Sequence, residues 1–172
     1  QYLSTLRTAE PSALQGQGER LAFWLNAYNA LVIEGVLTGL AGDPGFRVDE
    51  ETFRFFSQEP RLIAGFSMTL DQLENGVIRG DFQRAGVDVD DTLTAQMRSW
   101  HDALWGDAAV DPRIHVALNC GAVSCPNLLA AAWLNENAAG ETLDQQLQAA
   151  LVAFLGNASK GAGAAGISQI FT

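Results

Sequence analysis

The sequence predicts a helix-dominated α+β fold, with one domain over residues 1–172 and a small antiparallel sheet. Three observations lead to this prediction. A long apolar stripe fills Gly16–Leu40, other stretches carry helical periodicity, and strand signals are confined to short segments near the middle. A chain of 172 residues that is 48% hydrophobic fits one ordinary domain and can build a core without disulfides.

The first third of the chain is predicted to form two helices and a loop. Gln1–Glu10 has the pattern of a short helix, which Pro11 ends. Gly16–Leu40 is apolar on nearly every side, as is typical of a central helix. Gly42–Asp49 is rich in Gly, Pro and Asp and is expected to be a loop.

The middle of the chain carries the strand signals. Thr52–Phe56 and Arg61–Phe66 are expected to pair through the short turn between them. Thr69 and Gln72 have the spacing of a capping box, in which each side chain bonds the other residue's backbone N–H. A helix is therefore expected over Leu70–Arg79.

The next two elements are expected to bury apolar side chains. Asp90–Leu104 is a moderately amphipathic helix with Met97 and Trp100 facing inward. Arg113–Cys120 is apolar enough for a buried strand or for one or two buried helical turns.

The last third is predicted to hold two further helices. These cover Pro126–Trp133 and Thr142–Leu155. Gly156–Gly166 is rich in Gly and Ala and is expected to be loose, and Ile167–Phe171 is expected to dock as a short strand.

The charge of the chain argues against some partners. The formal net charge is −10, and the ten basic residues are scattered. Nucleic acids and anionic membrane surfaces bind clustered Lys and Arg, so neither partner is expected. The most apolar stretch, Leu21–Leu40, carries Asn26, Asn29 and Glu34, which suits a buried helix better than a transmembrane segment.

The segment Asp111–Pro126 concentrates reactive residue types, because it holds both cysteines and one of the two histidines. Pro126 suits the first turn of a helix, which would make Cys125 the N-cap. Unpaired backbone N–H groups there would stabilise a thiolate and could form part of an oxyanion hole. Two other readings stay open for Cys125: a disulfide with Cys120, or plain packing.

His115 is the expected base for such a nucleophile. It lies in an apolar run, where an imidazole needs a partner, and ten residues separate it from Cys125. A satisfied core histidine is the alternative. The other imidazole, His101, is explained by an exposed position on an amphipathic helix.

Glu74 is the candidate third member, which would orient His115 and fix its tautomer. It borders the apolar stripe of its predicted helix. The alternatives are an ion pair with Arg79 or a solvated carboxylate. Arg113 is a further candidate partner.

The remaining candidates would bind substrate or orient the site. Asn26 and Asn29 either line a pocket and orient the histidine, or hold the loop at residues 119–126 against the core. Asn119, Cys120 and Ser124 complete this set. Together Cys120, Cys125, His115 and Glu74 supply zinc-ligand types, but the C-x4-C spacing lacks a second cluster, so no metal or other cofactor is predicted.

Three segments together resemble the family known as domain of unknown function 547. They are Ala22–Ala30, Leu70–Gly80 and Asp111–Pro126, and Ile167–Phe171 is similar to the start of that family's C-terminal segment. The resemblance implies export, because bacterial members are often exported, so a periplasmic or secreted location is favoured and a cytoplasmic one stays open. It also implies that part of a C-terminal docking segment is missing.

The leading hypothesis is a thiol-dependent hydrolase or acyltransferase that acts on a small-molecule or peptide amide, ester or thioester. Cys125 would attack, His115 would carry the proton and Glu74 would orient His115, in a rearranged papain-like arrangement. The competing hypothesis is a non-catalytic exported interaction module with a structural Cys120–Cys125 disulfide. A small metal-binding domain is the third, and the sequence does not predict an oligomeric state.

Overall fold

A computed structural model describes the whole chain except residues 51–53, 87–91, 123, 164–165 and 168–172. The predicted fold class is confirmed: helices dominate, and the strands form two-stranded antiparallel sheets. The elements are α1 (Tyr2–Leu6), η1 (Pro11–Ala13), α2 (Gly16–Gly42), α3 (Arg54–Ser57), β1 (Arg61–Ile63), β2 (Phe66–Met68), η3 (Gln72–Ile78), α4 (Thr92–Trp105), α5 (Ile114–Ala117), α6 (Leu143–Leu155), β3 (Ala162–Gly163) and β4 (Gly166–Ile167).

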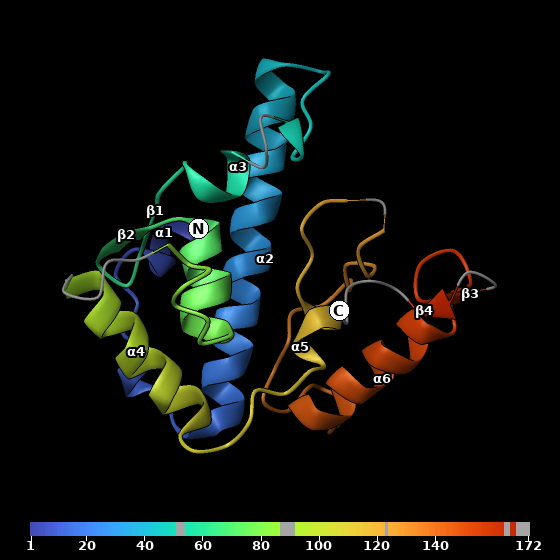
Figure 1. Cartoon of the computed structure of the whole chain (residues 1–172). Helices are drawn as coiled ribbons and strands as arrows, with labels where there is room; N and C mark the ends of the chain where they lie inside the picture. Colours follow the sequence, from blue (N-terminus) through green and yellow to red (C-terminus); the bar gives the residue numbers. More distant parts are fainter. Residues whose placement is uncertain (51–53, 87–91, 123, 164–165, 168–172) are drawn as a thin grey trace.

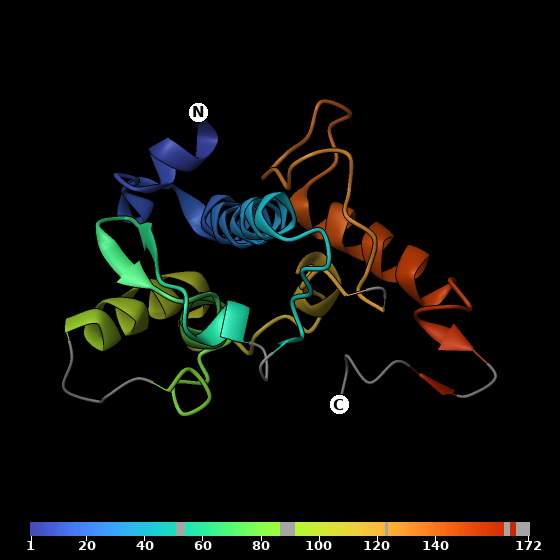
Figure 2. The same ribbon diagram turned by 90° about the horizontal axis from the view of Figure 1, so that it is seen from above.

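Helix α2 is the central element, as its apolar composition predicts. Figures 1 and 2 show α1, the β1–β2 hairpin, η3 and α4 on one side of it, and α5 and α6 on the other. Trp24, Leu25 and Tyr28 of α2 are almost fully buried, and the Trp24 ring contacts that of Trp100 in α4. Both halves of the chain therefore pack on one helix.

By length and composition, α2 could also cross a membrane. Half of its most apolar window is buried inside the protein, however, where it forms the core. The described residues hold no other helix of this kind, so no clear transmembrane segment is present.

The strand prediction is correct only in part. Arg61–Ile63 is a strand, but its partner is Phe66–Met68, with Arg61 opposite Met68. The predicted strand Thr52–Phe56 is wrong, since Arg54–Ser57 forms the short helix α3; residues 52 and 53 lie outside the described part. Two successive side chains there, Phe55 and Phe56, are both buried, which a half-buried strand does not allow.

The predicted helix over Leu70–Arg79 is present, and most of it is π-helical. Its capping box is confirmed: Thr69 N donates to Gln72 Oε1 at 2.9 Å, and Gln72 N donates to Thr69 Oγ1 at 3.2 Å. The widened turn is visible where Arg79 N donates to the Glu74 carbonyl, five residues earlier. Such π segments are frequent at functional sites.

The outcome for the later elements is mixed. Helix α4 buries Met97 and Trp100 as predicted, and α5 is one helical turn within the apolar run. Helix α6 begins at the predicted place, where Thr142 caps it. The predicted strand at 167–171 falls almost wholly outside the described residues, although Ile167 pairs with Ala162.

The predicted helix over Pro126–Trp133 is wrong, because this segment has irregular backbone. Asn119 Nδ2 donates to the Pro126 carbonyl at 2.5 Å. At the other end, the Asn26 side chain bonds both the N–H and the carbonyl of Trp133. Side chains from elsewhere in the chain thus form hydrogen bonds with backbone groups that would otherwise pair within a helix.

Candidate functional site

A polar cavity of about 400 Å³ opens between α2, α3, η3 and the loop that follows α5. Its walls mix aromatic rings, carboxylates, an amide, a guanidinium group and a sulfur; the lining residues are Tyr28, Phe56, Asp71, Glu74, Asn75, Arg84 and Cys120. Three distant segments of sequence, around Tyr28, Glu74 and Cys120, therefore meet at one place.

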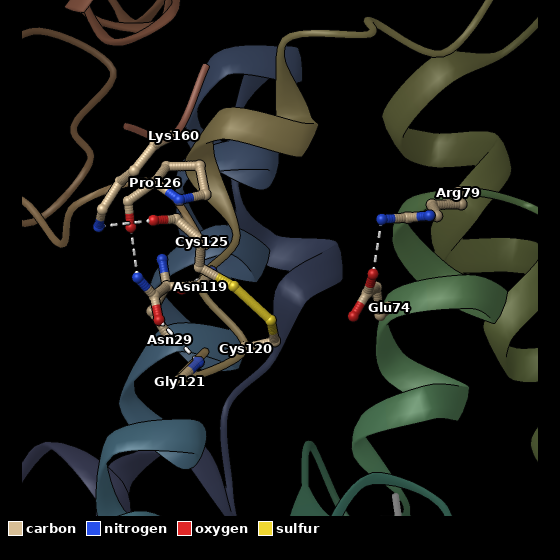
Figure 3. Close-up of a disulfide and its surroundings, with 9 residues drawn as sticks. All are labelled: Asn29, Glu74, Arg79, Asn119, Cys120, Gly121, Cys125, Pro126 and Lys160. Atoms are coloured by element: carbon tan, nitrogen blue, oxygen red, sulfur yellow. Dashed lines mark hydrogen bonds and ion pairs between the residues drawn. A yellow bond between two sulfur atoms is a disulfide. The ribbon is translucent and has the colours of Figure 1, made fainter. Parts of the chain in front are cut away.

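Glu74 is held from two directions. Its carboxylate lies 2.6 Å from Arg79 Nη2, the ion pair that the sequence left as an alternative (Figure 3). The Tyr28 hydroxyl also donates to it, and burial together with the Glu74 charge raises the pKa of Tyr28 well above its ordinary value. Tyr28 thus stays a hydrogen-bond donor at neutral pH, and Glu74 is a fixed, half-buried charge.

His115 is not among the residues that line the cavity, but the charges of Arg79 and Glu74 act on it. Burial, followed by the positive charge of Arg79, lowers the pKa of His115, and the Glu74 carboxylate opposes that effect. The imidazole is therefore neutral at neutral pH, which is the form that can accept a proton.

The other imidazole has a structural position. His101 is half-buried rather than exposed as predicted, and its Nδ1 lies 3.1 Å from the Val77 carbonyl. Its ring faces Phe82 and closely approaches Gly80. His101 thus fixes the end of η3.

The two cysteines form a disulfide, Cys120–Cys125, with their Cα atoms 6.5 Å apart. Cys120 lines the cavity, whereas Cys125 is only 5% exposed. Figure 3 shows the Cys120 end of the bond toward Glu74 and the Cys125 end away from it. The N-cap argument for Cys125 is wrong, because no helix begins at Pro126.

The disulfide loop is held by hydrogen bonds that do not involve sulfur. Asn29 donates to the Ala117 carbonyl at 2.8 Å and accepts from Asn119 N at 2.9 Å. Lys160 Nζ donates to the Cys125 carbonyl at 2.9 Å, although its segment was predicted to be loose. Gly121 has a φ of +80°, so a residue without Cβ suits the turn between the cysteines.

Asn26 and Asn29 act here as backbone clamps: Asn29 holds Ala117 and Asn119, whereas Asn26 holds Trp133 and not the loop at residues 119–126. Together with Asn119 they also line a separate cavity of about 350 Å³ beneath residues 126–133. Ser124 is exposed and lines neither cavity.

Arg113 does not pair with Glu74, so that prediction is wrong. Its guanidinium group lies 2.6 Å from both Asp111 and Asp144, and its hydrogen bonds lower the pKa of Asp111. Arg113 therefore joins α5 to the first turn of α6.

Several lining residues were missed from the sequence. A tyrosine on an apolar helix, such as Tyr28, is expected in the core. Asp71 and Asn75 lie in Leu70–Gly80, one of the segments that carry the family resemblance, whereas Arg84 lies outside these segments. Asn75 is the most informative, because it is buried in the cavity wall and its Oδ1 has no hydrogen-bond partner among the described residues. Buried polar atoms are rarely left unpaired, so such an atom calls for a specific explanation.

A metal centre has no ligand set within the described part of the chain, where no three His, Cys, Asp or Glu side chains cluster suitably. The disulfide also removes both thiolates that such a centre would use.

Fold and site together define a helix-dominated α+β domain with a polar cavity bordered by a disulfide. Residues 11–155 match the family described as protein of unknown function, DUF547, and the chain belongs to this family. No curated protein matches the chain. No solved structure matches it either.

Proposed function

We propose that the cavity is a thiol-dependent acyl-transfer site, which makes the protein a hydrolase or acyltransferase once its disulfide is reduced. The observation that carries the proposal is the meeting of Glu74 and Cys120 in one cavity, with His115 electrostatically coupled to Glu74. A thiol, a neutral imidazole and a fixed carboxylate are the groups that cysteine-dependent acyl transfer uses.

Cys120 is the nucleophile in this proposal, in place of Cys125. A nucleophile must reach the substrate, and Cys120 lines the cavity whereas Cys125 is buried. The helix dipole that would have favoured Cys125 is absent because residues 126–133 are irregular.

The proton moves through His115. The imidazole takes the Cys120 thiol proton, the thiolate forms a C–S bond with the acyl carbon, and the imidazolium returns the proton to the leaving group. Water or another acceptor then cleaves the thioester. Glu74 stabilises the imidazolium, while Tyr28 and Arg79 hold Glu74 in place.

The cavity lining favours an amide substrate over a simple ester. An amide N–H would give Asn75 Oδ1 the hydrogen bond that it lacks among the described residues. Phe56 offers an apolar surface, and Arg84 adds a positive charge at the same cavity. A peptide or N-acyl compound combines the features that these groups recognise.

Acyl trapping tests the proposal. Reduced protein is mixed with p-nitrophenyl acetate, quenched in acid, and the acetyl group is located by tandem mass spectrometry. Cys125→Ser should acetylate at Cys120, and Cys120→Ser, its matched control, should not react at Cys125. His115→Asn should slow acetylation by roughly 10²–10⁴-fold, the usual worth of a general base. Absence of acetyl-Cys120 in folded Cys125→Ser protein would exclude the proposal.

The second candidate is a non-catalytic exported interaction module. It is favoured by the closed disulfide, in a loop that Asn29, Asn119 and Lys160 also hold. Structural disulfides persist in oxidising compartments, so this candidate fits a periplasmic or secreted location. In this second case the reduced cysteines would remain unacylated.

A further inference from the structure

We propose that the disulfide is an exchangeable bond: an external low-molecular-weight thiol attacks Cys120 from the cavity, forms a mixed disulfide there and releases Cys125. The inference rests on the proposed function in one respect, since the exchange would switch that site on. Its chemical step needs only the disulfide and the cavity.

Accessibility decides which sulfur is attacked. In thiol–disulfide exchange the incoming thiolate approaches one sulfur and the other sulfur leaves. Cys120 borders a cavity of about 400 Å³, whereas Cys125 is 5% exposed. In Figure 3 the Cys120 end of the bond is also the end nearer Glu74, which lines the same cavity. An incoming thiolate therefore meets Cys120 first.

The electron balance is that of a two-electron reduction. The external thiolate RS⁻ bonds to Cys120 Sγ, the Cys120–Cys125 bond breaks, and the Cys125 thiolate takes a proton from solvent. A second RS⁻ then attacks the external sulfur of the mixed disulfide and gives RSSR and the free Cys120 thiol. Two thiols are oxidised and one protein disulfide is reduced.

The loop geometry makes the exchange reversible. Lys160 Nζ holds the Cys125 carbonyl, and Asn119 Nδ2 holds the next carbonyl, that of Pro126. Asn29 fixes the backbone N–H of Asn119, directly before Cys120. None of these bonds uses a sulfur atom, so both cysteines stay close after the disulfide opens. Cys125 is then the resolving thiol, which can displace RS⁻ from Cys120.

Reduced glutathione is the probe that tests the inference. The oxidised full chain is incubated with it under native conditions, quenched with N-ethylmaleimide in acid, and digested for tandem mass spectrometry. Glutathione is expected on Cys120 and N-ethylmaleimide on Cys125 of the same molecule. Glutathione mainly on Cys125, or on both cysteines equally, would overturn the inference, as would a disulfide that opens only after unfolding in urea.

Two single variants provide a matched comparison with oxidised glutathione. Cys125→Ser should form the mixed disulfide at Cys120. Cys120→Ser should form it at Cys125 at least about tenfold more slowly, because the buried sulfur must first be exposed by local opening. Equal rates in the two folded variants would contradict the assignment of Cys120.

The inference and the proposed function can fail separately. Glutathionylated Cys120 without any acetylation in the acyl-trapping experiment would keep the exchange and exclude acyl transfer. Acetylation of Cys125→Ser with no glutathione adduct in the wild-type protein would keep acyl transfer and exclude the exchange.

Discussion

In this protein, single asparagine side chains form hydrogen bonds with backbone groups that a helix or strand would otherwise pair. Asn29 bonds the Ala117 carbonyl and the Asn119 N–H, and Asn26 bonds both backbone groups of Trp133. Each amide thus pairs its donor and its acceptor with main chain, as a neighbouring strand would. This is how an irregular segment can be packed against the core.

Removing the Asn29 clamp should be costly. Asn29→Ala leaves an acceptor and a donor of the buried loop without their partner, so a loss of about 1–3 kcal/mol in the free energy of unfolding is expected. Urea denaturation measures it. Asn127→Ala is the control, since it removes only an exposed contact with Lys160 and should change stability by less than about 0.5 kcal/mol. Equal losses would argue against the clamp.

His115 should make stability depend on pH. Its pKa is lowered in the fold by burial and by Arg79, so the unfolded chain binds a proton more readily. Its contribution is then complete above its ordinary pKa of 6.5 and is lost as the pH falls through the lower pKa of the fold.

His115→Gln should therefore lose less stability than the wild-type protein between pH 8 and pH 5, because Gln does not titrate. The free energy of unfolding in urea at both pH values checks this. An identical loss in the two proteins would show that His115 is not responsible.

At the scale of elements, the end of η3 is fixed by a close contact with α4. Gly80 has a φ of +72°, and a Cβ added there would collide with the His101 ring. The ring is also held by the Val77 carbonyl, so it has little freedom to withdraw. The cavity wall carried by η3 thus depends on this contact.

Two glycine variants separate backbone strain from the collision. Gly86 has a φ of +62° with open space around its Cβ position, so Gly86→Ala should cost about 1–2 kcal/mol for the left-handed backbone alone. Gly80→Ala should cost roughly 1–3 kcal/mol more, the range for overpacking. Urea midpoints of the two variants give the comparison, and a Gly80→Ala cost no larger than that of Gly86→Ala would contradict the contact.

Helices and strands could be predicted where their sequence signals lie within a few residues of one another. The capping box predicted at Thr69 involves residues three apart and is present. Helix α6 starts after Thr142 as predicted, and a second capping box caps it there. The helix expected at Pro126–Trp133 does not form, because Asn26 and Asn119 donate hydrogen bonds to its backbone carbonyls. No local sequence pattern reveals these distant partners. Lys160 was missed for the same reason, since its partners are more than thirty residues away.

At the scale of the molecule, the candidate site lies between the two groups of elements that flank α2. Glu74 comes from the group containing η3 and α4, and Cys120 from the loop after α5, on the side of α6 (Figures 1 and 2). Tyr28 of α2 itself completes the cavity wall. Phe56 of α3 lines the cavity as well, so four separate stretches of sequence contribute to it.

The candidate site was predictable by residue type and only partly by role. His115 and the cysteines were identified because the sequence has only two histidines and two cysteines, and Glu74 because it borders the apolar stripe of its predicted helix. The reason for preferring Cys125 as the nucleophile was wrong. It required a helix that begins at Pro126, and tertiary hydrogen bonds prevent that helix. Tyr28 was not identified because a tyrosine on an apolar helix is expected in the core, although it lies in Ala22–Ala30, a segment that carries the family resemblance.

The fold should survive opening of the disulfide. A bridge between residues five apart restricts the unfolded chain little, so its loss should cost about 2 kcal/mol. Cys120→Ser/Cys125→Ser should keep the wild-type far-UV circular dichroism and unfold in urea at a modestly lower midpoint. A double variant that is unfolded in buffer would show that the bridge holds the domain together.

The central claim is that Cys120 is the activated thiol of this cavity, with His115 as its base. It is tested most directly by the pH dependence of iodoacetamide alkylation in the reduced protein, with each cysteine followed by mass spectrometry. Cys120 should react faster than Cys125, with an apparent thiol pKa below the ordinary value of about 8.5 that rises toward that value in His115→Asn. An unshifted pKa for Cys120, or a shift that His115→Asn leaves unchanged, would contradict the claim.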